Sequence, residues 1–388
     1  MRVCGIIAEY DPLHNGHAWH LREAKRLSGA EYIVCVLSGC FTQRGMPALL
    51  SPHIRARMAL EAGADIVLQP PFSFSVCNGE RFALGGISVL RQMGAESLCF
   101  GAEPDSIPLI EPAAELLEHP TASFQQRLRQ LLSEGNSFPK AQGTALAEAL
   151  NASADLLALP NAALAICYAR INLRLNAGMR MLPVPRSGQY HSDLLPQDGA
   201  LPSATAVRAA ALSGQWEQVK AALPPYAFAL LKSEFDQGRA HMPDALTPLL
   251  RWKLRTKRDF SLLPDLSEGV ENRLSSAADC LMRDDMVMQI KSRRYSYARI
   301  NRLLTHALTD TDSRQISTFP RYAYILGFRK EASRLLKLPE DAPLRLYSAA
   351  DPNAEDAEMR LDIRADDLWA LGANQPFGTI FREKPVIL

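Results

Sequence analysis

An α/β fold with a parallel sheet is predicted for the first hundred residues from two observations. Short, continuously apolar segments alternate there with longer segments whose apolar residues recur at helical spacing. Proline and glycine stand at several of the junctions, as in the segment 52–63, which begins with proline and ends with glycine. Apolar strands separated by amphipathic helices are typical of a Rossmann-like sheet that helices cover on both faces.

The expected elements follow in a regular order. Strands are expected at 3–10, 31–39, 64–71 and 96–101, and helices at 16–27, 52–63 and 79–94. Residues 105–178 are interpreted as a helical insertion, before a last strand at 181–185, a polar loop and a helix at 202–212. Crossovers in such sheets are right-handed and ligands bind at the carboxyl ends of the strands, so a site is expected there.

The chain is predicted to divide near residue 225. Its 388 residues suffice for two domains, and the pattern beyond 225 is helical. Residues 1–225 are therefore interpreted as the sheet domain and 226–388 as a mainly helical C-terminal domain. From about 339 the sequence turns rich in proline and acidic residues, which suggests a loosely tied small subdomain.

The composition is that of a cytoplasmic globular protein. Apolar residues make up 47% of the chain and charged residues 22%, and the net charge of +1 excludes a polycation. No apolar run is long enough to span a bilayer, and the first residues lack the long apolar stretch of a signal peptide. The seven cysteines contain no CxxC pair, which favours reduced thiols over a zinc knuckle.

The segment HNGHAWH (14–20) directly follows the first predicted strand. The first turn of a helix offers free backbone amides that attract a phosphate, and His14 and His17 flank that turn. Gly16 removes a side chain where a nucleotide must approach. The pattern therefore predicts a binding site for the polyphosphate of ATP, in which the histidines stabilise the charge that develops at the α-phosphorus. Zinc binding by the three histidines is the alternative, and His20 is interpreted as a wall residue.

The segment SATAVR (203–208) supplies a second indication. Ser203 would cap a helix and present amides to the β- and γ-phosphates, and Arg208, one turn further, would neutralise pyrophosphate. Alone, the segment is equally typical of an ordinary capped helix. HxGH after a first strand, followed by such a segment, resembles the nucleotidyltransferase superfamily and predicts a nucleotidyltransferase core.

Further segments narrow the resemblance. GIIAEYDPLHNGH, SGCFTQRGMPALL, ADIVLQPPFSFSV, FGAE, FPKAQ, LPNAALAICY, PRSGQYH and SATAVR are similar, in this order, to the tRNA(Met) cytidine acetate ligases, and the similarity continues through EGVENRL, IKSRRYSYARINRLLTHAL and RYAYILGF. The resemblance implies an enzyme that activates acetate with ATP to acetyl-adenylate and pyrophosphate, and Mg²⁺ is expected to accompany the ATP. The acetyl group then passes to the wobble cytidine of elongator tRNA(Met), giving N4-acetylcytidine and AMP.

Site residues are implied by the same resemblance. The ATP-binding positions are Ile7, Ala8, Glu9, Tyr10, Asp11, Pro12, Leu13, His14, Asn15, Gly16, His17, Ala18, Trp19, His20, Gly101, Asn161 and Arg186. The residues expected to act in catalysis are His14, His17, Ser203 and Arg208. No metal ligands are expected from the protein, and neither a membrane nor an obligate protein partner is expected.

A basic stretch in the C-terminal half is interpreted as an RNA contact. The residues are Lys291, Arg293, Arg294, Tyr295, Arg299 and Arg302, in a segment without an acidic residue. Tyr295 and its neighbour Tyr297 could stack on bases, and the cations could meet phosphates. The alternative is a solvated helix face.

Some positions depart from the family pattern. They are Asp11, Cys40, Ser51, Pro52, Gln69, Ala102, Ala165 and Cys167. Neutral side chains replace several polar ones, so the acetate and tRNA specificity is less firmly predicted than adenylation. Two alternatives stay open: a small-molecule nucleotidyltransferase, and a paralogue that binds nucleotide or RNA without acetylating it.

Overall fold

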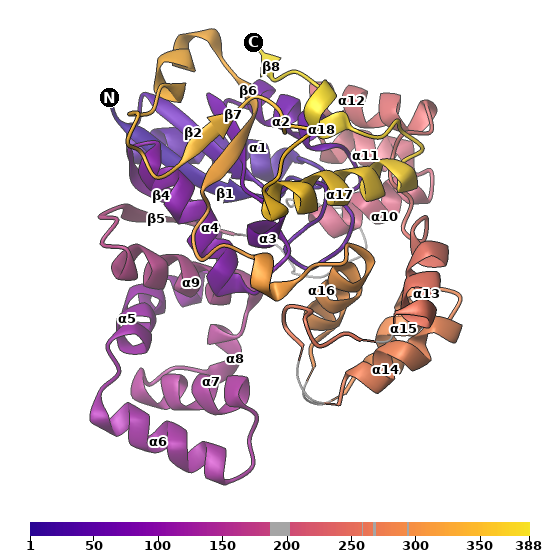
Figure 1. The fold of residues 1–388 in the computed structure, drawn as a ribbon. Helices are drawn as coiled ribbons and strands as arrows, with labels where there is room; N and C mark the ends of the chain where they lie inside the picture. Colours follow the sequence, from indigo (N-terminus) through magenta and orange to yellow (C-terminus); the bar gives the residue numbers. More distant parts are fainter. Residues whose placement is uncertain (187–201, 258, 267–268, 293–294) are drawn as a thin grey trace.

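One mostly parallel, eight-stranded sheet organises the molecule (Figure 1). The structure, a computed structural model, describes residues 1–186, 202–257, 259–266, 269–292 and 295–388. The strands are β1 (Val3–Ala8), β2 (Tyr32–Leu37), β3 (Ile66–Gln69), β4 (Ala95–Ala102), β5 (Arg180–Pro185), β6 (Tyr322–Phe328), β7 (Arg345–Tyr347) and β8 (Val386–Ile387). Their order is β5-β4-β1-β2-β3-β6-β7, and β8 also pairs with β6. The predicted α/β fold with a parallel core sheet is confirmed.

Helices cover both faces of this sheet. On one face lie α4 (Gly79–Gln92), α5 (Ile107–Glu118) and α9 (Pro160–Arg174), from which α6 (Ala122–Ser133), α7 (Phe138–Ala149) and α8 (Ala154–Leu157) extend. On the other lie α1 (Asn15–Ser28), α2 (Pro52–Glu61), α10 (Ala204–Leu212), α11 (Trp216–Ala222) and α12 (Pro225–Asp236). Strand residues alternate between the two layers: Val34 and Val36 face the first, and Ile33, Cys35 and Leu37 face the second.

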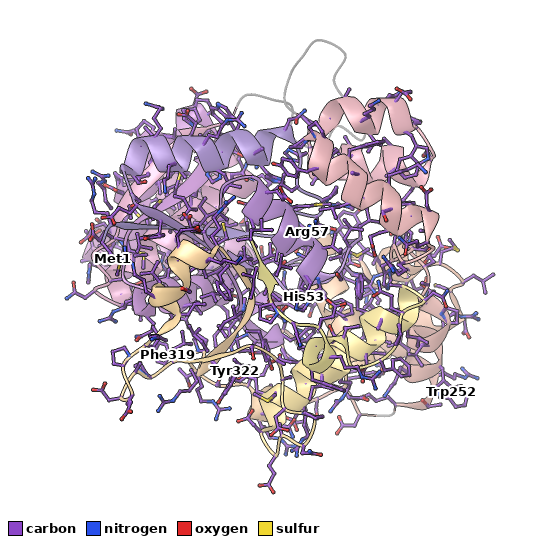
Figure 2. All side chains as sticks on the ribbon, turned by 90° about the horizontal axis from the view of Figure 1, so that it is seen from above. Met1, His53, Arg57, Trp252, Phe319 and Tyr322 are labelled. Atoms are coloured by element: carbon purple, nitrogen blue, oxygen red, sulfur yellow. The ribbon has the colours of Figure 1, made fainter. Side chains whose placement is uncertain are left out.

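A helical lobe packs beside the carboxyl ends of the strands. It consists of α13 (Thr247–Thr256), α14 (Glu271–Ser276), a short helix at Ala277–Asp279, α15 (Arg283–Ile290) and α16 (Tyr297–Leu308). Other short helices lie elsewhere in the chain, at Pro104–Ser106, Ser313–Gln315 and Lys330–Leu336. The core of the lobe also takes in α3 (Phe72–Ser75) and α17 (Ala357–Gly372), and α18 (Thr379–Arg382) follows α17. Trp252 projects from the outer rim of the lobe (Figure 2) and is 65% exposed.

The C-terminal half differs from its predicted organisation. Strand β6 pairs antiparallel with β3, so the sheet itself crosses the predicted boundary at residue 225. The segment from about 339 is firmly attached, because α17 buries Trp369 completely and the indole N–H of Trp369 donates to the carbonyl of Ala48 (2.6 Å). The segment therefore joins the sheet and the helical lobe instead of forming a loosely tied subdomain.

Candidate nucleotide site at the carboxyl edge of the sheet

The turn between β1 and α1 places two histidines at a helix mouth. Tyr10 adopts a left-handed backbone (φ 47°), which turns the chain away from the strand direction. His14 is the N-cap of α1, and the N–H of Gly16 donates to its Nδ1 (3.1 Å). The N–H of His14 in turn donates to Nδ1 of His17 (3.4 Å). The predicted helix start at Asn15 and Gly16 is therefore confirmed, and both rings are fixed by backbone amides.

The two imidazole rings lie face to face. Their centroids are 3.7 Å apart with an interplanar angle of 21°, and the ring of Tyr10 lies 5.0 Å from that of His17. Because each Nδ1 accepts a backbone hydrogen bond, we assign the ring proton to Nε2 in both. Stacked rings whose Nδ1 atoms already accept bonds do not converge on one metal ion. Within the described residues no group of three His, Cys, Asp or Glu side chains could hold a metal.

His14 carries an unsatisfied hydrogen-bond donor. The residue is 1% exposed, and its Nε2 has no partner among the described residues. Burial, with the nearby charges of Arg186 and Arg208, lowers the pKa of His14 to about 3, and burial also lowers the pKa of His17 well below its ordinary value. Both rings are therefore neutral at physiological pH. A buried, unbonded N–H at a helix mouth is suited to an anionic ligand oxygen.

His20 lies one turn deeper, as predicted for a wall residue. Its Nε2 lies 3.5 Å from the sulfur of Cys99 on β4. Burial lowers the pKa of His20 to about 4, so this ring is neutral as well. His20 therefore lies between α1 and the sheet, and it stays a predicted wall residue of the nucleotide site.

The SATAVR helix approaches the same turn. Ser203 caps α10, accepting from the N–H of Ala206 (3.0 Å). Arg208 donates to the backbone carbonyl of Asp11 (2.6 Å) and lies 3.4 Å from its Oδ2, while its other nitrogen donates to Thr205. The structure therefore brings Arg208 to the His14 turn, and the hydroxyl of Ser203 serves as a helix cap.

Three further predicted residues meet at the ends of β4 and β5. The Nη1 of Arg186 donates to Oδ1 of Asn161 (3.4 Å), and a Cβ atom at Gly101 would lie 2.7 Å from Cδ of Arg186. Glu103, which no sequence reasoning had selected, accepts from Nδ2 of Asn161 and from the N–H of Ala162 (both 2.9 Å). The segment FGAE carried this residue, at the position where a strand end faces a helix start.

Several other residues of the predicted ATP-binding stretch have scaffold roles. Ile7 and Ala8 lie in or beside the core, Leu13 and Ala18 are buried in it, and Trp19 packs against it. Asn15 donates to the carbonyl of Ala221 (2.9 Å). The carboxylate of Asp11 accepts from the N–H of Leu49 (2.7 Å). Pro12 follows Asp11 in a cis peptide bond. Direct nucleotide contact stays a prediction for these positions.

The structure changes the interpretation of the basic stretch. Arg302 is 7% exposed and its Nε donates to Asp265 (2.8 Å), while Arg299 donates to the backbone carbonyl of Asp265. Tyr295 is 7% exposed, in the core of the lobe, so Arg302 and Tyr295 are removed from an RNA-contacting surface. The ammonium of Lys291 lies 5.1 Å above the ring of Tyr297, which is 54% exposed. Arg293 and Arg294 lie outside the described residues.

The positions that depart from the family pattern fall in five places. Cys40 and Gln69 line one small internal cavity beside α17, where the thiol of Cys40 donates to Asp366 (3.1 Å). Ser51 caps α2 and Pro52 is its first residue. The remaining positions are Ala102 at the end of β4, Ala165 and Cys167 on α9, and Asp11 in the histidine turn. Of these, Ala102 and Asp11 border the cluster around His14 and Arg186.

Comparisons with known proteins agree with this geometry. The HIGH Nucleotidyl Transferase family model matches residues 1–380. The tRNA(Met) cytidine acetate ligase of Caldicellulosiruptor saccharolyticus is 34% identical over 384 residues, which covers 96% of this chain and 94% of that protein. The ligase of the same name from Clostridium perfringens is 30% identical over 386 residues, 95% of each chain.

Solved structures extend the similarity to the whole fold. The crystal structure of Thermotoga maritima TmcAL bound with alpha-thio ATP superposes with a TM-score of 0.89 at 26% identity, covering all of both chains. The apo form of the same protein gives a TM-score of 0.90 at 27% identity, again over both full lengths. Within the described part of the present chain, every helix is too short or too polar to serve as a membrane span.

Proposed function

Because this chain belongs to the tRNA(Met) cytidine acetate ligases within the HIGH nucleotidyl transferase family, we propose that it is an ATP-dependent, AMP-forming ligase that modifies tRNA. In the first step the carboxylate of acetate attacks the α-phosphorus of ATP, which gives acetyl-adenylate and releases pyrophosphate. In the second step the exocyclic amine of the wobble cytidine of elongator tRNA(Met) attacks the acetyl carbon, which gives N4-acetylcytidine and AMP.

The unsatisfied Nε2 of His14 is the observation that carries this proposal. A neutral ring whose Nδ1 is bonded to the backbone can only donate from Nε2, and a triphosphate oxygen is the acceptor that the helix mouth favours. His17 stacks on the same ring and holds it in place. We assign His14 and His17 to the α-phosphate, where fixed donors stabilise the charge that grows as pyrophosphate leaves.

Two cationic groups complete the phosphate side. Arg208 is held at the His14 turn by the carbonyl of Asp11, and Arg186, whose charge also acts on His14, directly follows β5. Ser203 fixes the first turn of α10 and thereby the position of Arg208. We propose that Mg²⁺ enters with ATP and is bound mainly by phosphate oxygens and water, since the described residues offer no cluster of ligands for it.

Adenylation activates acetate without a covalent enzyme nucleophile. The cysteine thiols are accordingly buried or half-buried and are not needed as nucleophiles. Five of the seven cysteines are buried and the other two are half-buried. Burial raises the pKa of Cys35 and of Cys77 to about 12, which keeps both as unreactive thiols at neutral pH.

We propose that the helical lobe binds the tRNA. The contacting surface contains fewer residues than the basic stretch predicted from the sequence. Tyr297 is exposed, its hydroxyl lies 3.8 Å from the sulfur of Met288, and Lys291 lies over its ring. An exposed aromatic ring with a cation beside it is suited to a stacked base and a nearby phosphate. We therefore propose that the tRNA contacts residues 226–388, and specifically helices α13–α16.

Labelled acetate tests the proposal directly. The protein is incubated with ATP, labelled acetate and bulk tRNA, and acid-precipitable label is followed, with His17→Ala as the control. We expect label in tRNA for the wild type and a large loss for the variant. Adenylylation of another small molecule without labelled tRNA would favour a small-molecule nucleotidyltransferase. Nucleotide or RNA binding with neither pyrophosphate release nor transfer would favour a non-acetylating paralogue.

A further inference from the structure

The second step leaves a proton to be removed. An amine that attacks an acyl carbon becomes positively charged, and it must lose a proton before the C–N bond is stable. Positioned carboxylates and histidines commonly accept such protons. His14 and His17 are poor candidates because their Nδ1 atoms already accept backbone hydrogen bonds, and burial lowers the pKa of both rings.

Within the described residues, three carboxylates lie at the strand ends around the nucleotide site, and two of them already accept hydrogen bonds or pair with a cation on both oxygens. Asp11 accepts from the N–H of Leu49 and pairs with Arg208. Glu103 uses one oxygen for Asn161 and the other for the N–H of Ala162. Both are therefore engaged in holding the site together, and neither offers an unbonded oxygen to a substrate.

Glu9 is different. The residue immediately follows β1 and is half-buried. Its Oε1 accepts from the N–H of Gln43 (2.6 Å), and its Oε2 accepts no hydrogen bond from the described residues. No cationic nitrogen of the described chain lies within 4.0 Å of this carboxylate. One oxygen is therefore anchored while the other is available to accept a proton.

The backbone of Glu9 is held in place by the buried side chain of Arg55. Arg55 is fully buried and donates from Nη1 to the carbonyl of Glu9 (2.7 Å). The same guanidinium donates to the carbonyls of Leu50 (3.0 Å) and Gly39, and so ties the ends of β1 and β2 together. A carboxylate on such a support keeps its position through a reaction cycle.

Glu9 lies on the side of β1 that faces the loop after β2. Its anchor, Gln43, belongs to the loop after β2, whereas the nucleotide contacts at Gly101 and Arg186 lie at β4 and β5, on the opposite side of β1. The same loop reaches the helical lobe, because the carbonyl of Gly45 accepts from Arg283 (3.0 Å). Glu9 is therefore placed between the nucleotide site and the lobe.

We propose that Glu9 is a catalytic residue of the transfer step, and this inference rests on the proposed function. The cytidine N4 forms a bond to the acetyl carbon, and the bond from that carbon to the phosphate oxygen breaks. AMP leaves with the electron pair, and one N4 proton passes to the Oε2 atom of Glu9. The proton then leaves to solvent, which restores the carboxylate.

The surroundings of Glu9 raise the pKa of its carboxyl, as is expected for a general base. Burial raises the pKa of the Glu9 carboxyl above its ordinary value, and the charge of Asp11 acts in the same direction. The amide of Gln43 and the cations Arg44 and Arg208 act against this rise. Arg55 faces the backbone carbonyl and is electrostatically coupled to the carboxyl as well. A raised pKa makes the carboxylate a stronger base.

Glu9→Gln separates the two steps. The amide is isosteric and can still accept from Gln43, so folding is retained. Acetyl-adenylate formation is followed by acetate-dependent ATP–pyrophosphate exchange and by trapping with hydroxylamine, a strong nucleophile that needs no base. Transfer is followed by single-turnover acetylation of tRNA. Glu96→Gln, at the exposed amino end of β4, is the matched control.

At saturating ATP, we expect Glu9→Gln to slow transfer on the order of 100-fold or more beyond any change in exchange and hydroxamate formation. The wild-type transfer rate should rise with pH until the Glu9 carboxyl is ionised, and the variant should lose that limb. Unchanged transfer, or an equal loss in both steps, overturns the inference. A wild type that gives neither exchange with acetate nor transfer instead refutes the proposed function.

Discussion

Replacing His14 tests whether its ring binds a phosphate, because this ring has two separable roles. Its Nδ1 caps α1 by accepting from Gly16, and its Nε2 is the unsatisfied donor. Asparagine is among the best N-cap residues, so His14→Asn keeps the first role and removes the second. His14→Ala removes both. Comparison of the two variants therefore isolates the donor.

The magnitudes follow from the two contacts. A hydrogen bond to a charged phosphate oxygen contributes about 1.5–3 kcal/mol, so both variants should lose about 10- to 150-fold in adenylation. Loss of an N-cap costs about 1 kcal/mol of stability, so the unfolding free energy of His14→Ala should lie about 1 kcal/mol below that of His14→Asn.

Acetate-dependent ATP–pyrophosphate exchange measures the first quantity, and urea unfolding measures the second. The rates are compared at equal concentrations of folded protein. An exchange rate of His14→Asn within twofold of the wild type would refute the donor role of Nε2. A normal His14→Asn beside a weak His14→Ala would show that the helix cap alone explains the motif.

Three other features give predictions. Arg302→Ala should lower the unfolding free energy by about 3 kcal/mol in urea titrations, because it leaves Asp265 unpaired; a stable variant with weakened tRNA binding would contradict the buried placement. Tyr297→Ala should leave stability unchanged and weaken tRNA binding about fivefold or more in filter binding, and unchanged affinity would exclude a stacking contact. Burial lowers the pKa of His241 and of His306 to about 4, so below pH 6.5 the native state binds fewer protons than the unfolded chain. The unfolding free energy should therefore fall as pH drops from 6.5 to 4, by up to about 1.4 kcal/mol per pH unit for each ring, and His306→Gln should flatten this slope.

The parts that were predictable from sequence depend on local patterns. The parallel strands are continuously apolar, and the position of His14 and His17 follows from a strand end, a glycine and a helix start within a few residues. Strand β6 could not be placed in the same way. Its partner β3 lies about 250 residues earlier and runs antiparallel to it, and no local signal specifies such a pairing.

The basic stretch shows how a local sequence pattern can mislead. A run of cations without acids indicates an RNA surface when only neighbours in sequence are considered. In the fold, however, Asp265 approaches α16 from 37 residues away and pairs with Arg302. Glu9 illustrates a third case: its type and position were visible, but only the structure shows that Asp11 and Glu103 are engaged while Oε2 of Glu9 is not.

The nucleoside composition of tRNA after the reaction tests the central claim most directly. Elongator tRNA(Met) is incubated with the protein, ATP and acetate, digested to nucleosides and analysed by mass spectrometry, with AMP and pyrophosphate counted in parallel. The account predicts one N4-acetylcytidine at the wobble position for each AMP and each pyrophosphate formed. Unmodified cytidine in the presence of folded, ATP-binding protein would contradict it.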